Sequence, residues 1–167
     1  MRSWIIALGL LLFWFIVPLQ FFIIGNDYGY GVQGAVYRYQ ITTTGISLIP
    51  IPWEMTYITS GIYTGNSALS ILLWFAGTLV LALTAIISLI HLETLTLRTY
   101  RLLYIGMAVS GVLYLGSCIA RYGIFFSGPA GVSIPVGIIV LMMCALFLFY
   151  YQNIFLENVS HHDGVPG

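Results

Sequence analysis

The sequence predicts an all-α membrane protein, namely a four-transmembrane-helix bundle with a small antiparallel β-segment in a long first extracytoplasmic loop. Three observations predict this fold class. Of 167 residues only 6% are charged and 60% are hydrophobic, and the mean hydropathy is +1.00. Four apolar runs have the length of a bilayer span, and one long connection is rich in aromatic and β-branched residues. Because soluble domains carry about a quarter charged residues, the composition excludes a soluble enzyme, a disordered tail and a nucleic-acid-binding protein.

Four uncharged runs are each close to the ~20 residues that a helix needs to cross ~30 Å of hydrocarbon. We expect a membrane helix at each of them: 3–24, 69–90, 102–120 and 134–151. Arg2 followed by an apolar run is also typical of a secretory signal peptide, but no small-x-small cleavage site follows. An uncleaved first helix, kinked locally at Pro18, is therefore favoured. The whole chain is expected to form a single integral membrane domain.

The positions of the arginines predict the orientation in the cell membrane. Arg2 precedes the first run, and Arg98 with Arg101 lies in the short connection between the second and third runs. Cytoplasmic loops carry an excess of Lys and Arg. We therefore expect a multi-pass protein whose N-terminus and C-terminal tail, residues 152–167, are both cytoplasmic.

The external segment 25–68 is too long for a structureless loop in a compact protein. Residues 36–44 and 55–59 are dense in aromatic and β-branched types, and they are separated by Pro50-Ile51-Pro52. This pattern predicts two or more antiparallel strands. Since an isolated hairpin is marginal in water, the sheet must rest on the helices or on a neighbouring protein.

The same segment is rich in tyrosine, which is enriched at recognition surfaces. We expect the aromatic residues of this loop to bind a partner; these are Tyr28, Tyr30, Tyr37, Tyr39, Trp53, Tyr57 and Tyr63. The other interpretation is that the tyrosines cover the sheet's own core or lie at the lipid headgroups. The leading hypothesis is a non-catalytic scaffold, assembly or interaction subunit. Its partners would be membrane lipids and either copies of itself or other membrane-protein subunits.

Small residues predict where helices approach closely in lipid. One stripe lies on the third run and a second on the second run, and together they comprise Gly106, Ser110, Gly111, Gly116, Ser117, Thr78, Ala82 and Ala85. Internal packing is the favoured role, and a dimer face is the other. If the first stripe faced a lumen, the protein would be an oligomeric channel or facilitator with a small-residue pore lining.

Arg121 ends the third run, where a cation needs water or a carboxylate partner. The external acids are Asp27 and Glu54. We expect Arg121 to form an ion pair with one of them and so join the loop to the helices. The alternative is that Arg121 holds a ligand carboxylate or a lipid phosphate.

No motif for catalysis, a metal or a cofactor is present. The four runs contain no Asp, Glu, Lys, Arg or His, which disfavours a proton-coupled transporter and a haem site. Cys118 and Cys144 lie in apolar runs, and whether they pair is open. We therefore expect no enzyme, no catalytic residues, no cofactor and no metal, with a lipid-modifying enzyme as a remote third hypothesis.

The order of the expected elements resembles the claudin-type tetraspan arrangement. The resemblance is one of topology: the loop has a single tryptophan, Trp53, and no cysteine between residues 25 and 68, where that family has Gly-Leu-Trp followed by paired cysteines. No residue role and no activity is therefore taken from the family.

Overall fold

The structure, a computed structural model, describes residues 3–25, 28–91 and 97–162, and the side chains of 8–25, 28–91 and 98–152. The chain runs through helices and strands in the following order: α1 (Ser3–Phe15), β1 (Gln20–Ile24), β2 (Gly29–Gln33), β3 (Tyr37–Thr42), β4 (Gly45–Pro50), α2 (Ile51–Thr59), α3 (Gly65–Ile90), α4 (Leu97–Tyr122), β5 (Ser127–Gly128), β6 (Gly131–Ile134) and α5 (Val136–His162).

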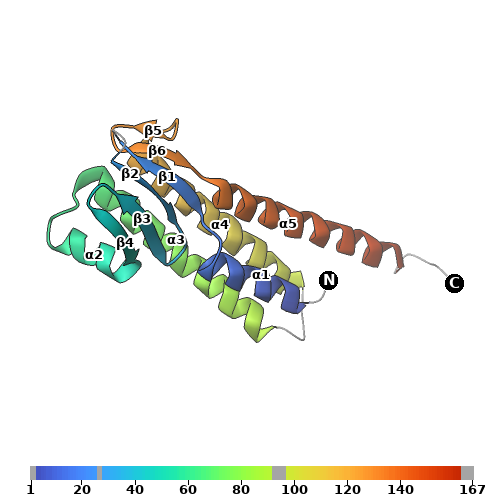
Figure 1. The fold of residues 1–167 in the computed structure, drawn as a ribbon. Coiled ribbons are helices and arrows are strands. Elements are labelled where there is room, and N and C mark those ends of the chain that lie inside the picture. The colour runs from blue at the N-terminus through green and yellow to red at the C-terminus, as the bar shows by residue number, and fades with distance from the viewer. Residues whose placement is uncertain (1–2, 26–27, 92–96, 163–167) are drawn as a thin grey trace.

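The strands form one antiparallel sheet with the order β4-β3-β2-β1-β6-β5 (Figure 1). Strands β1 to β4 follow one another along the chain. Strand β6 comes from the connection between α4 and α5 and pairs with β1, with Phe21 opposite Ile134. This pairing brings the two connections on this side of the helices into a single sheet.

One face of the sheet lies along α3 and α4 near the Gly65 and Tyr122 ends of these helices (Figure 1). The turn between β2 and β3 is fixed to α3, because Trp74 Nε1 donates to the Gly34 carbonyl oxygen at 3.0 Å and Thr78 Oγ1 donates to that of Ala35 at 2.5 Å. The Ser3 end of α1 and the His162 end of α5 lie at the opposite end of the molecule.

The helices share a continuous buried core. Its largest side chains lie on α3, α4 and α5, and they include Trp74, Leu81, Leu103, Tyr114 and Leu141. This core packs together the helices against which the sheet lies.

The prediction of an all-α, four-helix tetraspan bundle is wrong. The described residues contain five helices and a six-stranded antiparallel sheet, and only α3 and α4 are long and apolar enough to span a membrane. Helix α1 has 13 residues, and the described apolar part of α5, Val136–Gln152, is also shorter than a full span. Apolar run length therefore overestimated the number of membrane-length helices.

The error is clearest in residues 3–24, which were expected to form one helix. Residues 20–24 form β1 instead, in the middle of the sheet. Pro18 lacks a backbone N–H group and disfavours a helical residue before it, so the helix ends upstream. The side chains that follow then alternate between buried and exposed, as a strand requires. In the sequence, an apolar strand that follows an apolar helix cannot be distinguished from one long hydrophobic run.

Candidate functional site

A buried ion pair lies between the sheet and the helices. Arg38 is on β3 and Glu54 is on α2, and Arg38 Nη1 donates to Glu54 Oε1 at 2.6 Å. Both side chains are almost fully buried, at 3% and 0% exposure. Tyr37 and Tyr39 flank Arg38, and strand alternation turns Arg38 to the opposite face of the sheet from these two tyrosines.

The Arg38 guanidinium is surrounded on every side. Its Nη2 donates to Gln33 Oε1 at 3.0 Å, and its Cζ lies 5.8 Å from the Phe22 ring centroid and 5.4 Å from that of Trp74. Such contacts are favourable for a cation over an aromatic face. Burial and the nearby charge of Arg121 lower the pKa of Arg38 to about 10, although Glu54 opposes the shift. Arg38 is therefore charged at neutral pH and held by its neighbours.

A chain of polar side chains continues from Arg38 across the inner face of the sheet. Gln20 Nε2 donates to Gln33 Oε1 at 2.8 Å. Gln20 Oε1 in turn accepts from Ser133 Oγ at 2.6 Å and from Cys118 Sγ at 2.8 Å. We call this set, together with Arg38 and Glu54, the inner polar network. It connects α2, four strands and α4.

The predicted ion pair between Arg121 and Asp27 or Glu54, which was to join the loop to the helices, is not the pair that the structure shows for Glu54. Glu54 pairs with Arg38, and Asp27 lies outside the described residues. Arg121 Nη1 and Glu54 Oε2 are buried atoms without a hydrogen-bond partner among the described residues. The loop is joined to the helices through the inner polar network, in which Arg38 is the arginine that binds Glu54.

The inner polar network offers little for catalysis. Cys118 donates to an amide oxygen, and no base contacts it among its described hydrogen bonds. Within the described residues no group of three or more His, Cys, Asp or Glu could hold a metal ion, and Cys118 and Cys144 are both free. The network is a structural link between sheet and helices.

The opposite face of the sheet is apolar. We call it the outer face. Two rows of side chains cross five strands in register, Ile134-Phe21-Val32-Tyr39-Leu48 and Val132-Ile23-Tyr30-Ile41-Ile46. Seven of these ten side chains are between 40% and 69% exposed, and none carries a charge. The polarity of the sheet is thus inverted, since its polar side chains face the helices.

The predicted partner-binding residues separate into groups. Tyr30 and Tyr39 are on the outer face, and Tyr28 is exposed just before β2. Tyr57 and Tyr63 pack against each other edge to face, with ring centroids 5.7 Å apart. Tyr37 is half-buried on β3, and Trp53 is exposed on α2. The structure therefore brings three of the seven, Tyr30, Tyr37 and Tyr39, onto the outer face.

The predicted small-residue stripes lie between helices. Ser110 Oγ donates to the Gly77 carbonyl oxygen at 2.9 Å, and Ser117 Oγ donates to that of Ser70 at 2.8 Å. A side chain at Gly106 would collide with Thr84. Gly111 lies against Met142, and Gly116 lies near Leu73. Thr78 donates to the Ala35 carbonyl oxygen. Ala85 is buried and Ala82 is half-buried.

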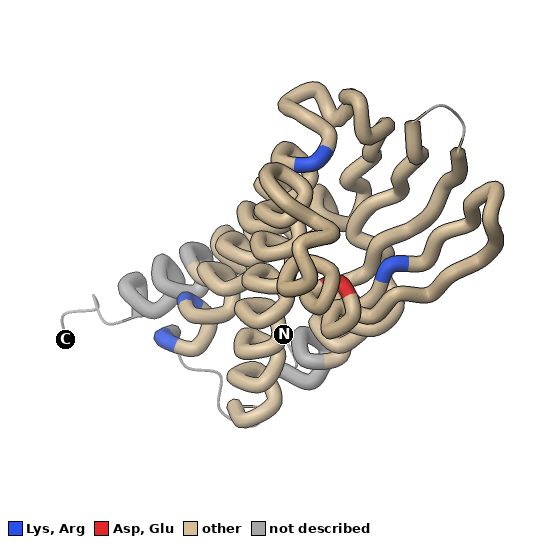
Figure 2. Tube along the Cα trace, turned by 90° about the vertical axis from the view of Figure 1, so that its left-hand side faces the viewer, with Lys and Arg blue, Asp and Glu red and all other residues tan. Residues whose placement is uncertain are grey.

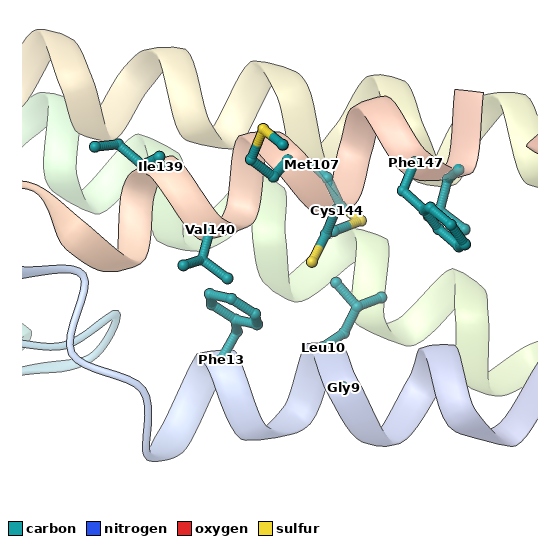
Figure 3. Close-up of a pocket in the computed structure, with 10 residues that line it drawn as sticks. Gly9, Leu10, Phe13, Met107, Ile139, Val140, Cys144 and Phe147 are labelled. Carbon is teal, nitrogen blue, oxygen red and sulfur yellow. The ribbon is translucent and has the colours of Figure 1, made fainter. Parts of the chain in front are cut away.

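An apolar cavity of about 480 Å³ lies between α1, α4 and α5 (Figure 3). Leu10 and Phe13 of α1 point across it toward Cys144 and Val140 of α5. Its other lining residues are Gly9, Met107, Ile139, Met143, Phe147 and Leu148. Because its lining is almost entirely apolar, the cavity offers no hydrogen bonds to water.

Sequence reasoning missed Arg38 and the pairing of β6 with β1. Arg38 carried a signal, because a single cation inside the aromatic run 36–44 needs a buried acid or solvent. The pairing of β6 with β1 carried no signal in the sequence. Residues 131–134 lie about 110 positions from β1, and pairing over such a distance leaves no local pattern. No model of a known protein family matches the chain, and no curated protein matches it either.

Proposed function

We propose that this protein is a non-catalytic interaction subunit of the cell membrane that docks through its outer face onto a neighbouring membrane protein or a second copy of itself. The inverted polarity of the sheet is the observation that carries the proposal. An antiparallel sheet with one wet face normally places its apolar side toward the core and its polar side toward water. Here Arg38, Gln33 and Gln20 face the helices, and apolar rows face outward.

An uncovered apolar surface of this kind is unusual. The largest exposed apolar patch on a monomeric protein is about 300–600 Å² and often functional. The outer face carries seven large exposed apolar side chains on adjoining strands. Such a surface is stabilised when another apolar surface covers it.

The distribution of polar and apolar side chains on the helices also supports a membrane location, because here too the polar side chains face inward and large apolar side chains face outward. Inward faces of α3 and α4 carry Ser and Thr, including Ser70, Thr78 and Ser110, whereas exposed positions carry large apolar residues such as Leu79, Leu83 and Val112. Between their ends these helices carry no charge (Figure 2). In lipid, small and polar residues join helices and apolar side chains face the acyl chains.

We further propose that α3 and α4 both cross the membrane, which makes the protein multi-pass. Arg98 and Arg101 lie in the first turns of α4, at the end away from the sheet. Because basic residues concentrate on the cytoplasmic side, this end is cytoplasmic and the sheet lies toward the extracytoplasmic side. Its β2–β3 turn reaches the middle of α3, at Trp74 and Thr78. The Ser3 end of α1 and the His162 end of α5 then lie on the cytoplasmic side.

The pore hypothesis has no comparable support. The stripe that would have lined a lumen is used inside the molecule, where Ser110 and Ser117 bind carbonyl oxygens of α3. We therefore propose the interaction function alone.

The mass of the protein purified in mild detergent tests the proposal. We expect wild-type protein to form a particle larger than a monomer, either with copies of itself or with another protein. Ile23→Glu places a charge on the outer face and should release the monomer. The matched control, Ile62→Glu, changes an exposed isoleucine in the α2–α3 connection and should leave the particle intact. A wild-type monomer without any co-purifying protein contradicts the proposal.

A further inference from the structure

We infer that the surface covering the outer face is the outer face of a second copy of this chain, packed sheet against sheet in the same membrane. The inference rests on the proposed function and names its partner. The area, the symmetry and the orientation of the outer face each support it.

The exposed area matches what a stable dimer needs. With about 150–200 Å² for each of these residues, the lower part of the range for aromatic side chains, the exposed fractions of the seven amount to roughly 560–750 Å². A standard interface buries ~800 Å² on each partner. The three half-buried members of the outer face add to this area, so one copy can supply an interface of standard size.

The outer face is self-complementary about its central strand. Strand β2 has two strands on each side within the two rows, β3 and β4 on one side and β1 and β6 on the other. A two-fold axis running along β2 therefore places Tyr30 opposite the partner's Tyr30 and Val132 opposite the partner's Ile46. Every such pair is apolar or aromatic, so the contact buries no unpaired charge.

The orientation of the sheet allows this contact within one membrane. The outer face points sideways, away from α3 and α4, because the inner face lies along these helices (Figure 1). Two copies related by an axis along the membrane normal then stand side by side with the same orientation. Their sheets pack face to face at ~10 Å, the spacing of a β-sandwich.

Cross-linking of introduced cysteines by a short bifunctional thiol reagent tests this dimer in the full-length protein in its native membrane. A reagent with a spacer is used because Cα atoms about 10 Å apart cannot be joined by a direct disulfide. The two copies of position 30 face each other across the two-fold axis, so Tyr30→Cys should form a covalent dimer when this reagent is added. Copies of position 46 lie two strands from the axis on opposite sides, about 19 Å apart sideways at ~4.8 Å per strand, and the gap between the sheets adds to this distance. Ile46→Cys alone should therefore cross-link at least tenfold less, whereas Ile46→Cys combined with Val132→Cys should cross-link as well as Tyr30→Cys. The wild type, with native Cys118 and Cys144, gives the background.

Each outcome decides the inference. Efficient linkage at Tyr30→Cys and in the double variant, with little at Ile46→Cys, supports it. Strong linkage at Ile46→Cys alone indicates pairing through the free edge of β4 and overturns it. If no variant links while a different protein co-purifies and is released by Ile23→Glu, the dimer fails and the proposed function stands. If no variant links and the wild type is monomeric, both fail.

Discussion

At the scale of single residues, the Arg38–Glu54 pair determines how the sheet is held. Burial lowers the pKa of Arg38 to about 10, so keeping this guanidinium charged costs stability at every pH below that value. The cost is offset by Glu54, by Gln33 and by two aromatic rings. Buried pairs contribute little net stability while both partners are present, but loss of one partner leaves an uncompensated buried charge.

This asymmetry gives a prediction for the pair. Arg38→Met or Glu54→Met alone should lower the free energy of unfolding by about 3–5 kcal/mol. The double variant, which removes both charges, should lose less than either single variant. Thermal unfolding in detergent measures these changes, with the exposed Arg98→Met as a control expected to shift stability by no more than about 0.5 kcal/mol. Additive losses in the double variant would contradict the pairing.

At the scale of helices and strands, the contact between α3 and α4 depends on small residues at specific positions. At Gly106 an added Cβ would collide with the Thr84 side chain, whereas at Gly116 the nearest atom, Leu73 Cδ1, would be 3.5 Å away. Both glycines are on α4, so the helix propensity gained by a change to alanine is similar for the two.

Alanine substitution at these two glycines should have opposite effects. Gly106→Ala should destabilise the protein by about 1–3 kcal/mol because overpacking separates the helices. Gly116→Ala should be neutral or stabilising by up to about 1 kcal/mol, because it removes backbone freedom without a clash. Thermal unfolding of both variants in one detergent checks this, and equal effects would contradict the packing described.

For individual helices and strands, the sequence predicted some segments correctly and others wrongly. Residues 69–90 and 102–120 fall within α3 and α4, because a long uncharged apolar run without proline favours helix as its local structure. Residues 20–24 were misplaced, since β1 depends on its pairing with β6, which lies far along the chain. The consecutive residues Phe21, Phe22 and Ile23 are apolar on both faces of β1, so the strand that follows α1 looks like a continuation of a membrane helix.

The ion pair of Glu54 likewise depends on contacts between distant parts of the chain. Arg121 was expected to pair with Asp27 or Glu54, but Glu54 binds Arg38 instead. The choice depends on the register that turns Arg38 inward and on where α2 folds back against β3. Neither can be read from local composition.

At the scale of the whole molecule, both the helices and the sheet have apolar outer surfaces and bury polar side chains, such as Ser110 and Arg38, inside. Such a molecule is suited to surroundings of lipid and protein rather than water. The orientation in the membrane then determines which partners can reach the outer face.

That orientation is testable by cysteine labelling in intact cells. Thr43, in the exposed β3–β4 turn, and Arg101, exposed near the start of α4, lie at opposite ends of the molecule. Thr43→Cys should react with a membrane-impermeant maleimide from outside, whereas Arg101→Cys should react only after permeabilisation. The reverse pattern would contradict the proposed orientation.

The central claim is that the outer face is covered by protein in the native membrane, and one labelling rate tests it most directly. Tyr30→Cys, on the outer face, and Thr43→Cys, at the nearby turn, are compared for reaction with the same impermeant maleimide. The account predicts that Tyr30→Cys reacts at least tenfold more slowly in native membranes and as fast as Thr43→Cys once a dissociating detergent separates the subunits. Equal rates in native membranes would contradict it.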